Sequence, residues 1–176
     1  KTQNWQPATS SYRGFFEALP VALYLSFPDG TLLGANPAMV ELLGYPSRDA
    51  LLGTNMAQLY ADPAARETWK RELLSAGTVH GFEVELIRFD GASVWVRETA
   101  RAVHDEDDGT TVFLGQLSDV SQRRSAEDAL RYSEARYRTL FDAARDAIFL
   151  MEGERFVECN PATLEVFAAG REEIVG

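Results

Sequence analysis

The chain has 176 residues, of which 45% are hydrophobic and 25% charged, so it can bury a core beneath an ordinary polar surface. Its formal net charge of −10 at pH 7 repels nucleic-acid phosphates and anionic membrane surfaces, and we expect neither as a partner. We expect no signal peptide in this sequence, and it contains no apolar run of roughly 20 residues that could span a membrane. The single cysteine, Cys159, excludes an internal disulfide framework and favours a cytoplasmic location. Because the sequence starts at Lys1 without an initiator Met, we expect it to be a piece of a longer protein.

The first third of the chain predicts a helix, a hairpin and a second helix. Residues 1–9 form a polar tail, and an amphipathic helix is expected from Ser10. Two β-rich runs, VALYLSF and TLLGAN, flank a Pro-Asp-Gly turn and predict a hairpin. Asn36 is a good N-cap, Pro37 suits the first helical position, and Gly44 marks the end of that helix.

The middle of the chain predicts several helices and then a three-stranded meander. SRDALLG and NMAQLY favour short helices, and a longer helix is expected between an Asp62 cap and Gly77. FEVELIRF, SVWVRETARAV and TVFLGQLSDV predict strands joined by Asp90-Gly91 and by the acidic turn at residues 105–109. Two strands, then helices, then three strands predict an α+β fold, in which short helices cover one face of a five-stranded antiparallel sheet.

A continuous helix is predicted after the sheet, over residues 121–142. This segment lacks Pro and Gly and carries Glu/Arg pairs at i, i+4 spacing. A weak coiled-coil seam is formed by Ala126, Leu130, Ser133, Tyr137 and Leu140. The seam could pair in parallel with a second chain or dock on its own sheet, and the sequence leaves both arrangements open.

The opening of the chain is repeated about 125 residues later. GANPAMVELL aligns with ECNPATLEVF, and identities include Asn36 with Asn160 and Pro37 with Pro161. The repeat predicts a complete domain over residues 10–120, a linker helix, and the first third of a second domain over residues 143–176.

These motifs resemble the PAS domain family. PDGTLLGANPAMVELLGYPSRDALLG is similar to the opening of a PAS domain, and GFEVELIRFDGASVWVRETARAV with FLGQLSDVSQRR is similar to its closing strands. Asp119-Val120-Ser121 stands where PAS domains commonly carry Asp-Ile-Thr. The linker resembles those between tandem PAS domains of bacterial sensor histidine kinases and diguanylate cyclases.

The resemblance implies a sensory, signal-transducing and dimerising module of a bacterial signalling protein, most often a histidine kinase. A cyclic-di-GMP enzyme with GGDEF or EAL output, or a ligand-free structural spacer, are the alternatives. The fragment itself carries no phosphate-binding loop, nucleophile elbow or zinc motif, so we expect it to be non-catalytic.

The resemblance also places a ligand pocket between the inner face of the sheet and the short helices. A filled core without a ligand is the alternative. The pocket candidates are Tyr24, Met39, Met56, Tyr60, Trp69, Phe82, Val84, Trp95 and Phe113.

The identity of a cofactor stays open. Heme-binding relatives use a histidine on the long helix, where this chain has none; His80 lies just beyond it and is expected to be a surface residue. Flavin-binding LOV relatives use a cysteine where this chain has Met56, which argues against a covalent flavin adduct. A non-covalent flavin or a small metabolite remains open. The HDEDDGTT turn does not match a calcium loop, and we expect no metal site.

Signal coupling is expected at the junction of the last strand and the linker helix. There the Asp119 carboxylate can cap the helix and pair with Arg97 or Arg123. A homodimer is expected through the N-terminal helix, the sheet face or the linker helix.

Overall fold

The computed structural model describes residues 10–104 and 109–175, and the chain divides into two compact units, residues 1–122 and 123–176. The predicted tail and most of the predicted acidic turn lie outside the described residues. Helix α6 (Ser121–Ala143) begins in the first unit and continues in the second. None of the helices in the described ranges is long and apolar enough to cross a membrane.

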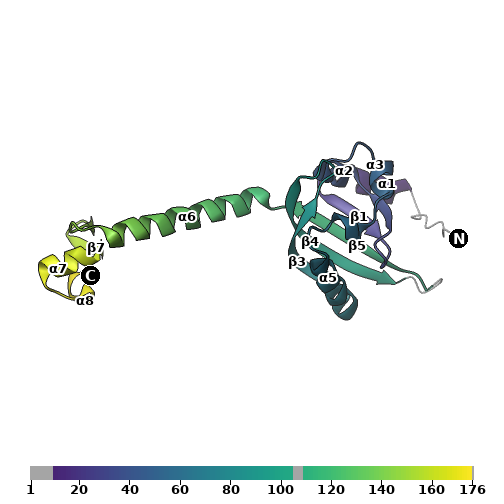
Figure 1. The fold of residues 1–176 in the computed structure, drawn as a ribbon. Helices are drawn as coiled ribbons and strands as arrows, with labels where there is room; N and C mark the ends of the chain where they lie inside the picture. The colour runs from purple at the N-terminus through teal and green to yellow at the C-terminus, as the bar shows by residue number, and fades with distance from the viewer. Residues whose placement is uncertain (1–9, 105–108, 176) are drawn as a thin grey trace. The chain divides into compact units, whose positions relative to one another are not determined.

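The first unit contains a five-stranded antiparallel sheet in the order β2-β1-β5-β4-β3, which confirms the predicted fold class (Figure 1). The strands are β1 (Ala22–Ser26), β2 (Leu32–Ala35), β3 (Thr78–Ile87), β4 (Ser93–His104) and β5 (Thr111–Asp119). The prediction started β3 too late, at Phe82. Gly81 has a φ of +69° at a shift of register, and this bulge lets pairing continue back to Thr78.

The helices of the first unit begin and end largely where caps are predicted. They are α1 (Ser10–Ala18), α2 (Pro37–Leu43), α3 (Arg48–Leu52), α4 (Met56–Leu59) and α5 (Pro63–Ala76). Asn36 caps α2, and Asp62 caps α5, while Gly44 and Gly77 end these helices in the left-handed conformation. Buried side chains of α2 to α5 pack on one face of the sheet, which is the inner face.

The second unit repeats the opening of the first. Besides most of α6, it contains β6 (Phe149–Glu152), β7 (Arg155–Cys159), α7 (Pro161–Phe167) and α8 (Arg171–Ile174). Strands β6 and β7 form a two-stranded antiparallel sheet. Since no third strand among the described residues covers β6, all four of its residues are exposed.

Asn36 and Asn160 hold the two openings in the same way. Each amide is fully buried, its oxygen accepts from two backbone N–H groups, and its nitrogen donates to two backbone carbonyls. The N–H groups belong to Leu23 and Met39 in the first unit and to Ile148 and Thr163 in the second. The carbonyls belong to Leu19 and Val21 and to Ala144 and Asp146. The sequence repeat is therefore also a repeat of structure.

Candidate functional site

Most of the nine pocket candidates lie together in the core of the first unit. The seven buried ones are Tyr24, Met39, Met56, Tyr60, Trp69, Val84 and Phe113. Phe82 is half-buried and packs against the same core. The placement of Trp95 was wrong. It alternates with the buried Val94 and Val96 along β4, so its side chain lies on the opposite, outer face of the sheet.

A buried carboxyl group, which the sequence analysis did not identify, lies among these residues. Glu98 of β4 is 0% exposed. Tyr24 of β1 donates its hydroxyl hydrogen bond to Oε1 of Glu98, and Tyr60 donates to Oε2 at 2.5 Å. A carboxyl group in the core needs such partners, because an unpaired buried charge is very costly. Glu98 therefore links the end of α4 to the middle of the sheet.

A buried guanidinium group lies beside this carboxyl. Arg66 of α5 is 3% exposed, and its Nη1 donates to the Tyr60 hydroxyl at 3.4 Å. Its guanidinium carbon lies 4.2 Å from the centroid of the Trp69 ring and 5.3 Å from that of Tyr60, which is cation–π distance. We call Tyr24, Tyr60, Arg66, Trp69 and Glu98 the buried polar cluster.

The buried polar cluster is not saturated with hydrogen bonds. Nη2 of Arg66 and Nε1 of Trp69 are buried and have no hydrogen-bond partner among the described residues. Both atoms are N–H donors, and they belong to residues one turn apart on α5. Buried polar groups are usually paired, so these two donors fit an acceptor oxygen such as that of a carbonyl, a carboxylate or a water molecule.

Burial changes the proton affinity of the cluster. It raises the pKa of the Glu98 carboxyl, while the hydrogen bonds from Tyr24 and Tyr60 oppose that change. The pKa values of Tyr24 and Tyr60 are also raised, first by burial and then by the negative charge of Glu98. Burial therefore opposes ionisation of the carboxyl and of both phenols.

A signal for this site was present in the sequence. Along β4 the residues Val94, Val96, Glu98 and Ala100 share one face by period-two alternation, and the first two are apolar. A glutamate in that row must be buried. Arg66 is harder to find, because Asp62, Glu67 and Lys70 make the exposed part of α5 equally charged.

The two histidines lie at the periphery. His80 is exposed beside the bulge at Gly81. His104, at the end of β4, contacts the Thr111 hydroxyl through Nδ1 at 3.0 Å. Among residues 10–104 and 109–175 no group of three or more His, Cys, Asp or Glu side chains is placed to hold a metal ion.

The junction between β5 and α6 contains Asp119, one of the three predicted coupling residues. Its Oδ1 accepts a hydrogen bond of 2.8 Å from the N–H of Ser121, the first residue of α6. Its Oδ2 pairs with Arg88 Nη2 at 3.6 Å. The expected pairing with Arg97 was wrong, since Asp119 lies opposite Val96, and the neighbouring Arg97 points to the other face.

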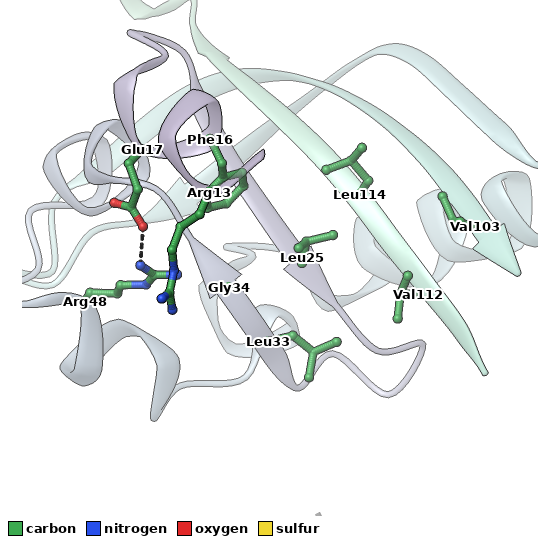
Figure 2. Close-up of a pocket in the computed structure, with 10 residues that line it drawn as sticks. All are labelled: Arg13, Phe16, Glu17, Leu25, Leu33, Gly34, Arg48, Val103, Val112 and Leu114. Atoms are coloured by element: carbon green, nitrogen blue, oxygen red, sulfur yellow. Dashed lines mark hydrogen bonds and ion pairs between the residues drawn. The ribbon is translucent and has the colours of Figure 1, made fainter. Parts of the chain in front are cut away.

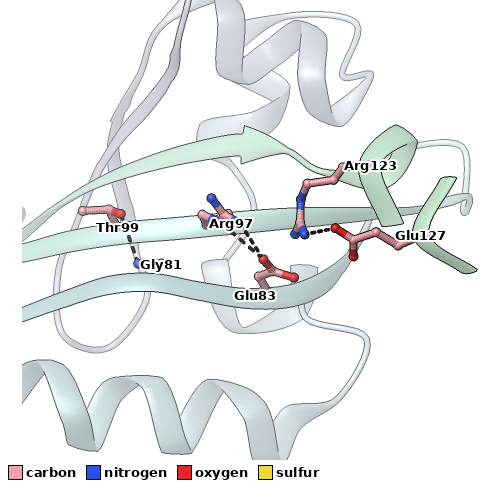
Figure 3. A network of polar contacts seen from close by, with 6 residues as sticks. All are labelled: Gly81, Glu83, Arg97, Thr99, Arg123 and Glu127. Atoms are coloured by element: carbon pink, nitrogen blue, oxygen red, sulfur yellow. Dashed lines mark hydrogen bonds and ion pairs between the residues drawn. The ribbon is translucent and has the colours of Figure 1, made fainter. Parts of the chain in front are cut away.

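The other two coupling candidates have different partners. Arg97 donates from Nε and Nη2 to Glu83, which lies directly opposite it on β3 (Figure 3). Arg123 Nη1 pairs with Glu127 one turn further along α6. The N–H of Gly81 donates to the Thr99 hydroxyl beside the first of these pairs. The Arg97–Glu83 ion pair therefore links β3 to β4 on the outer face of the sheet.

Comparisons with known proteins agree with this architecture. Sporulation kinase A of Bacillus subtilis (strain 168) is 27% identical over 176 residues, which cover 96% of this chain and 28% of that protein. Sensor histidine kinase TmoS of Ectopseudomonas mendocina is 24% identical over 123 residues, covering 68% and 12%. The chain thus spans less than a third of the length of these relatives. The crystal structure of a PAS domain from Colwellia psychrerythraea superposes with a TM-score of 0.56 at 22% identity, covering 64% of this chain and 96% of that one.

The family assignment follows from the sequence match and the fold. The sequence profile of the PAS domain matches residues 20–122, more than half of the chain, and a second PAS domain profile matches residues 135–175. The first match includes the whole five-stranded sheet, and the second includes the repeated hairpin and α7. This chain belongs to the PAS domain family.

Proposed function

We propose that this chain is a sensory and signal-transducing module of a bacterial sensor histidine kinase, and that its first PAS domain binds a small molecule at the buried polar cluster. The observation that carries the proposal is the pair of buried, unpartnered donors on α5, Arg66 Nη2 and Trp69 Nε1. Leaving such groups unpaired costs free energy, which a ligand oxygen would recover. The kinase assignment is supported by the names of the two relatives.

The proposed signal passes from α5 through the sheet to α6. A ligand that takes hydrogen bonds from Arg66 pulls this side chain away from the Tyr60 hydroxyl, and this changes the hydrogen bond to Glu98 on β4. Three residues along β4, the Trp95 carbonyl accepts from the N–H of Val120, and the Trp95 N–H donates to the Ser121 hydroxyl. Because these two hydrogen bonds join β4 to the start of α6, a shift of β4 changes the position of the first residues of α6.

The layout of the longer protein is also a proposal. We take residues 10–120 as the sensing domain, residues 121–142 as the linker, and residues 143–176 as the opening of a second PAS domain. We further propose a cytoplasmic homodimer. A reducing location is supported by the single, free Cys159.

Native mass spectrometry of the gently purified chain, with a visible absorption spectrum of the same sample, tests the ligand. We expect an added mass on the wild type and its loss in Arg66→Met, which removes the buried guanidinium donors at similar volume and leaves Trp69 in place. Arg71→Met, an exposed residue on the same helix, is the matched control and should keep the added mass. The thermal shift given by a library of carboxylate and carbonyl metabolites extends the test to ligands lost in purification.

Two outcomes decide between sensing and a structural role. Bare chain mass together with no library hit that depends on Arg66 would refute ligand sensing at the cluster and favour a spacer. Autophosphorylation of the full-length protein tests the second step. A response to ligand that survives Arg66→Met there would show that the signal arises elsewhere.

A further inference from the structure

A pocket lies on the outer face of the sheet, away from the buried polar cluster. It has a volume of about 400 Å³, within the range of small-molecule sites (Figure 2). Its floor is formed by strand residues that point away from the core, and Phe16 of α1 forms a wall. The apolar lining used below consists of Phe16, Leu25, Leu33, Val112 and Leu114.

Charged groups gather at one end of this pocket. Arg48 of α3 pairs with Glu17 of α1 through Nη1 and Oε1, which neutralises one cation. Arg13 also lines the pocket, and its guanidinium forms no hydrogen bond or ion pair with the described residues. Figure 2 shows both arginines at one end of the pocket, and Leu114, Val112 and Val103 line the strands toward the other end. The charged end carries one net positive charge in a chain of net charge −10.

We infer that this outer pocket binds an aliphatic monocarboxylate, with its carboxylate at Arg13 and Arg48 and its hydrocarbon chain along the strands. A guanidinium recognises a carboxylate by charge-assisted hydrogen bonds, and the apolar floor favours a chain without polar groups. The separation of a cationic end from an apolar trough fits an amphipathic anion.

Isothermal titration calorimetry of the 1–176 chain with hexanoate, octanoate and decanoate tests the inference. Each methylene that is buried should strengthen binding roughly fourfold until the trough is full. Decanol and decyltrimethylammonium have the same chain without the anionic group, and they should bind at least tenfold more weakly than decanoate.

Two variants locate the site. Arg13→Gln removes the unpaired cation from an exposed helix position and should weaken decanoate binding about tenfold. Gly34→Val fills the pocket from β2, where an added Cβ lies 3.7 Å from Leu25 Cδ1 and 3.9 Å from Arg48 Nη2, both ordinary contacts. It should abolish binding without loss of the fold. Arg71→Gln on α5 is the matched control and should bind like the wild type.

The results separate this site from the proposed sensing site. Decanoate binding that survives Gly34→Val but is lost in Arg66→Met would place the ligand in the core and overturn the outer-pocket assignment. Equal binding of decanol and decanoate, or no decanoate binding, would also overturn it. If Gly34→Val dissociates a dimer and the wild type binds no decanoate, this face is an interface with a second copy of the chain.

Discussion

At the scale of single residues, Glu98 makes stability depend on pH. Burial raises the pKa of its carboxyl in the folded chain, so the folded state holds this proton more tightly than the unfolded state does. The contribution of the proton is present in full below the ordinary carboxyl pKa and is lost as the pH rises through the folded-state value.

We expect Glu98→Gln, which keeps the shape and cannot ionise, to remove this dependence. As the pH rises above the ordinary carboxyl pKa, the free energy of unfolding of the wild type should fall relative to that of the variant. Urea unfolding at a series of pH values measures the difference. Parallel curves for the two proteins would mean that folding does not raise the pKa of Glu98.

Gly115 is required for space. It lies opposite Tyr24 in the β1–β5 pairing, and a Cβ there would lie 2.1 Å from Tyr24 Cε1. The ring can move only by giving up its hydrogen bond to Glu98. We expect Gly115→Ala to destabilise the first unit by about 1–3 kcal/mol in chemical denaturation. Gly14→Ala, with no atom within 4 Å of the added Cβ, is the control for added bulk; because it lies inside α1, it should not destabilise and can stabilise by up to about 1 kcal/mol.

Ala168 ends α7 where Gly44 ends α2 in the first copy. Its φ of +50° makes it the one described non-glycine residue with positive φ. An L side chain in this region costs about 1 kcal/mol. Ala168→Gly should therefore stabilise the second unit by about that amount, and Gly44→Ala should destabilise the first by a similar amount. Hydrogen exchange of the amides in α7 and α2 reports each change separately.

At the scale of elements, the junction of β5 and α6 depends on one carboxylate. Asp119→Ala removes the hydrogen bond to the Ser121 N–H and the ion pair with Arg88. Because both contacts are partly exposed, we expect a loss of about 1 kcal/mol or less in folding stability. In the longer histidine kinase proposed above, the variant should disconnect ligand binding from output, measured as autophosphorylation. Unchanged output would contradict the coupling role; Glu83→Gln, which breaks the Arg97 pair, is the comparison.

The elements themselves were largely predictable from local chemistry. Helix ends are marked by capping residues that act within one turn. Helices α2 and α5 begin and end at the caps that the sequence predicts, which are Asn36-Pro37 and Gly44 for α2 and Asp62-Pro63 and Gly77 for α5. The bulge at Gly81 depends on strand pairing, which short patterns do not contain. The side of the sheet that Trp95 faces was present in the sequence, in its alternation with Val94 and Val96. The unpaired donors of Arg66 and Trp69 depend on what surrounds them in three dimensions, and so the site was predicted only as a set of apolar and aromatic residues.

At the scale of the whole molecule, the long helix α6 has an exposed apolar seam. Leu130 is 60% exposed and Leu140 is 63% exposed. If these side chains pack between two chains, the double variant Leu130→Glu, Leu140→Glu should raise the dissociation constant of a dimer at least about tenfold. Sedimentation equilibrium measures it. Leu74→Glu, equally exposed on α5 at 54%, is the matched control. An unchanged constant would move the interface to α1 or the outer face of the sheet.

The two buried asparagines have a consequence for the order of folding. The contacts of Asn36 close loops of 13, 15 and 17 residues, whereas β1 must wait for β5, about 90 residues later, to complete the sheet. Short loops close quickly and at low entropic cost, so the opening of each PAS repeat can form while the rest of the chain is still unfolded. A chain emerging from the ribosome would then carry an ordered hairpin and helix with β1 unpaired on one side. The repeat sets two such starting points in a single polypeptide, and during synthesis we expect the one nearer the N-terminus to be completed first.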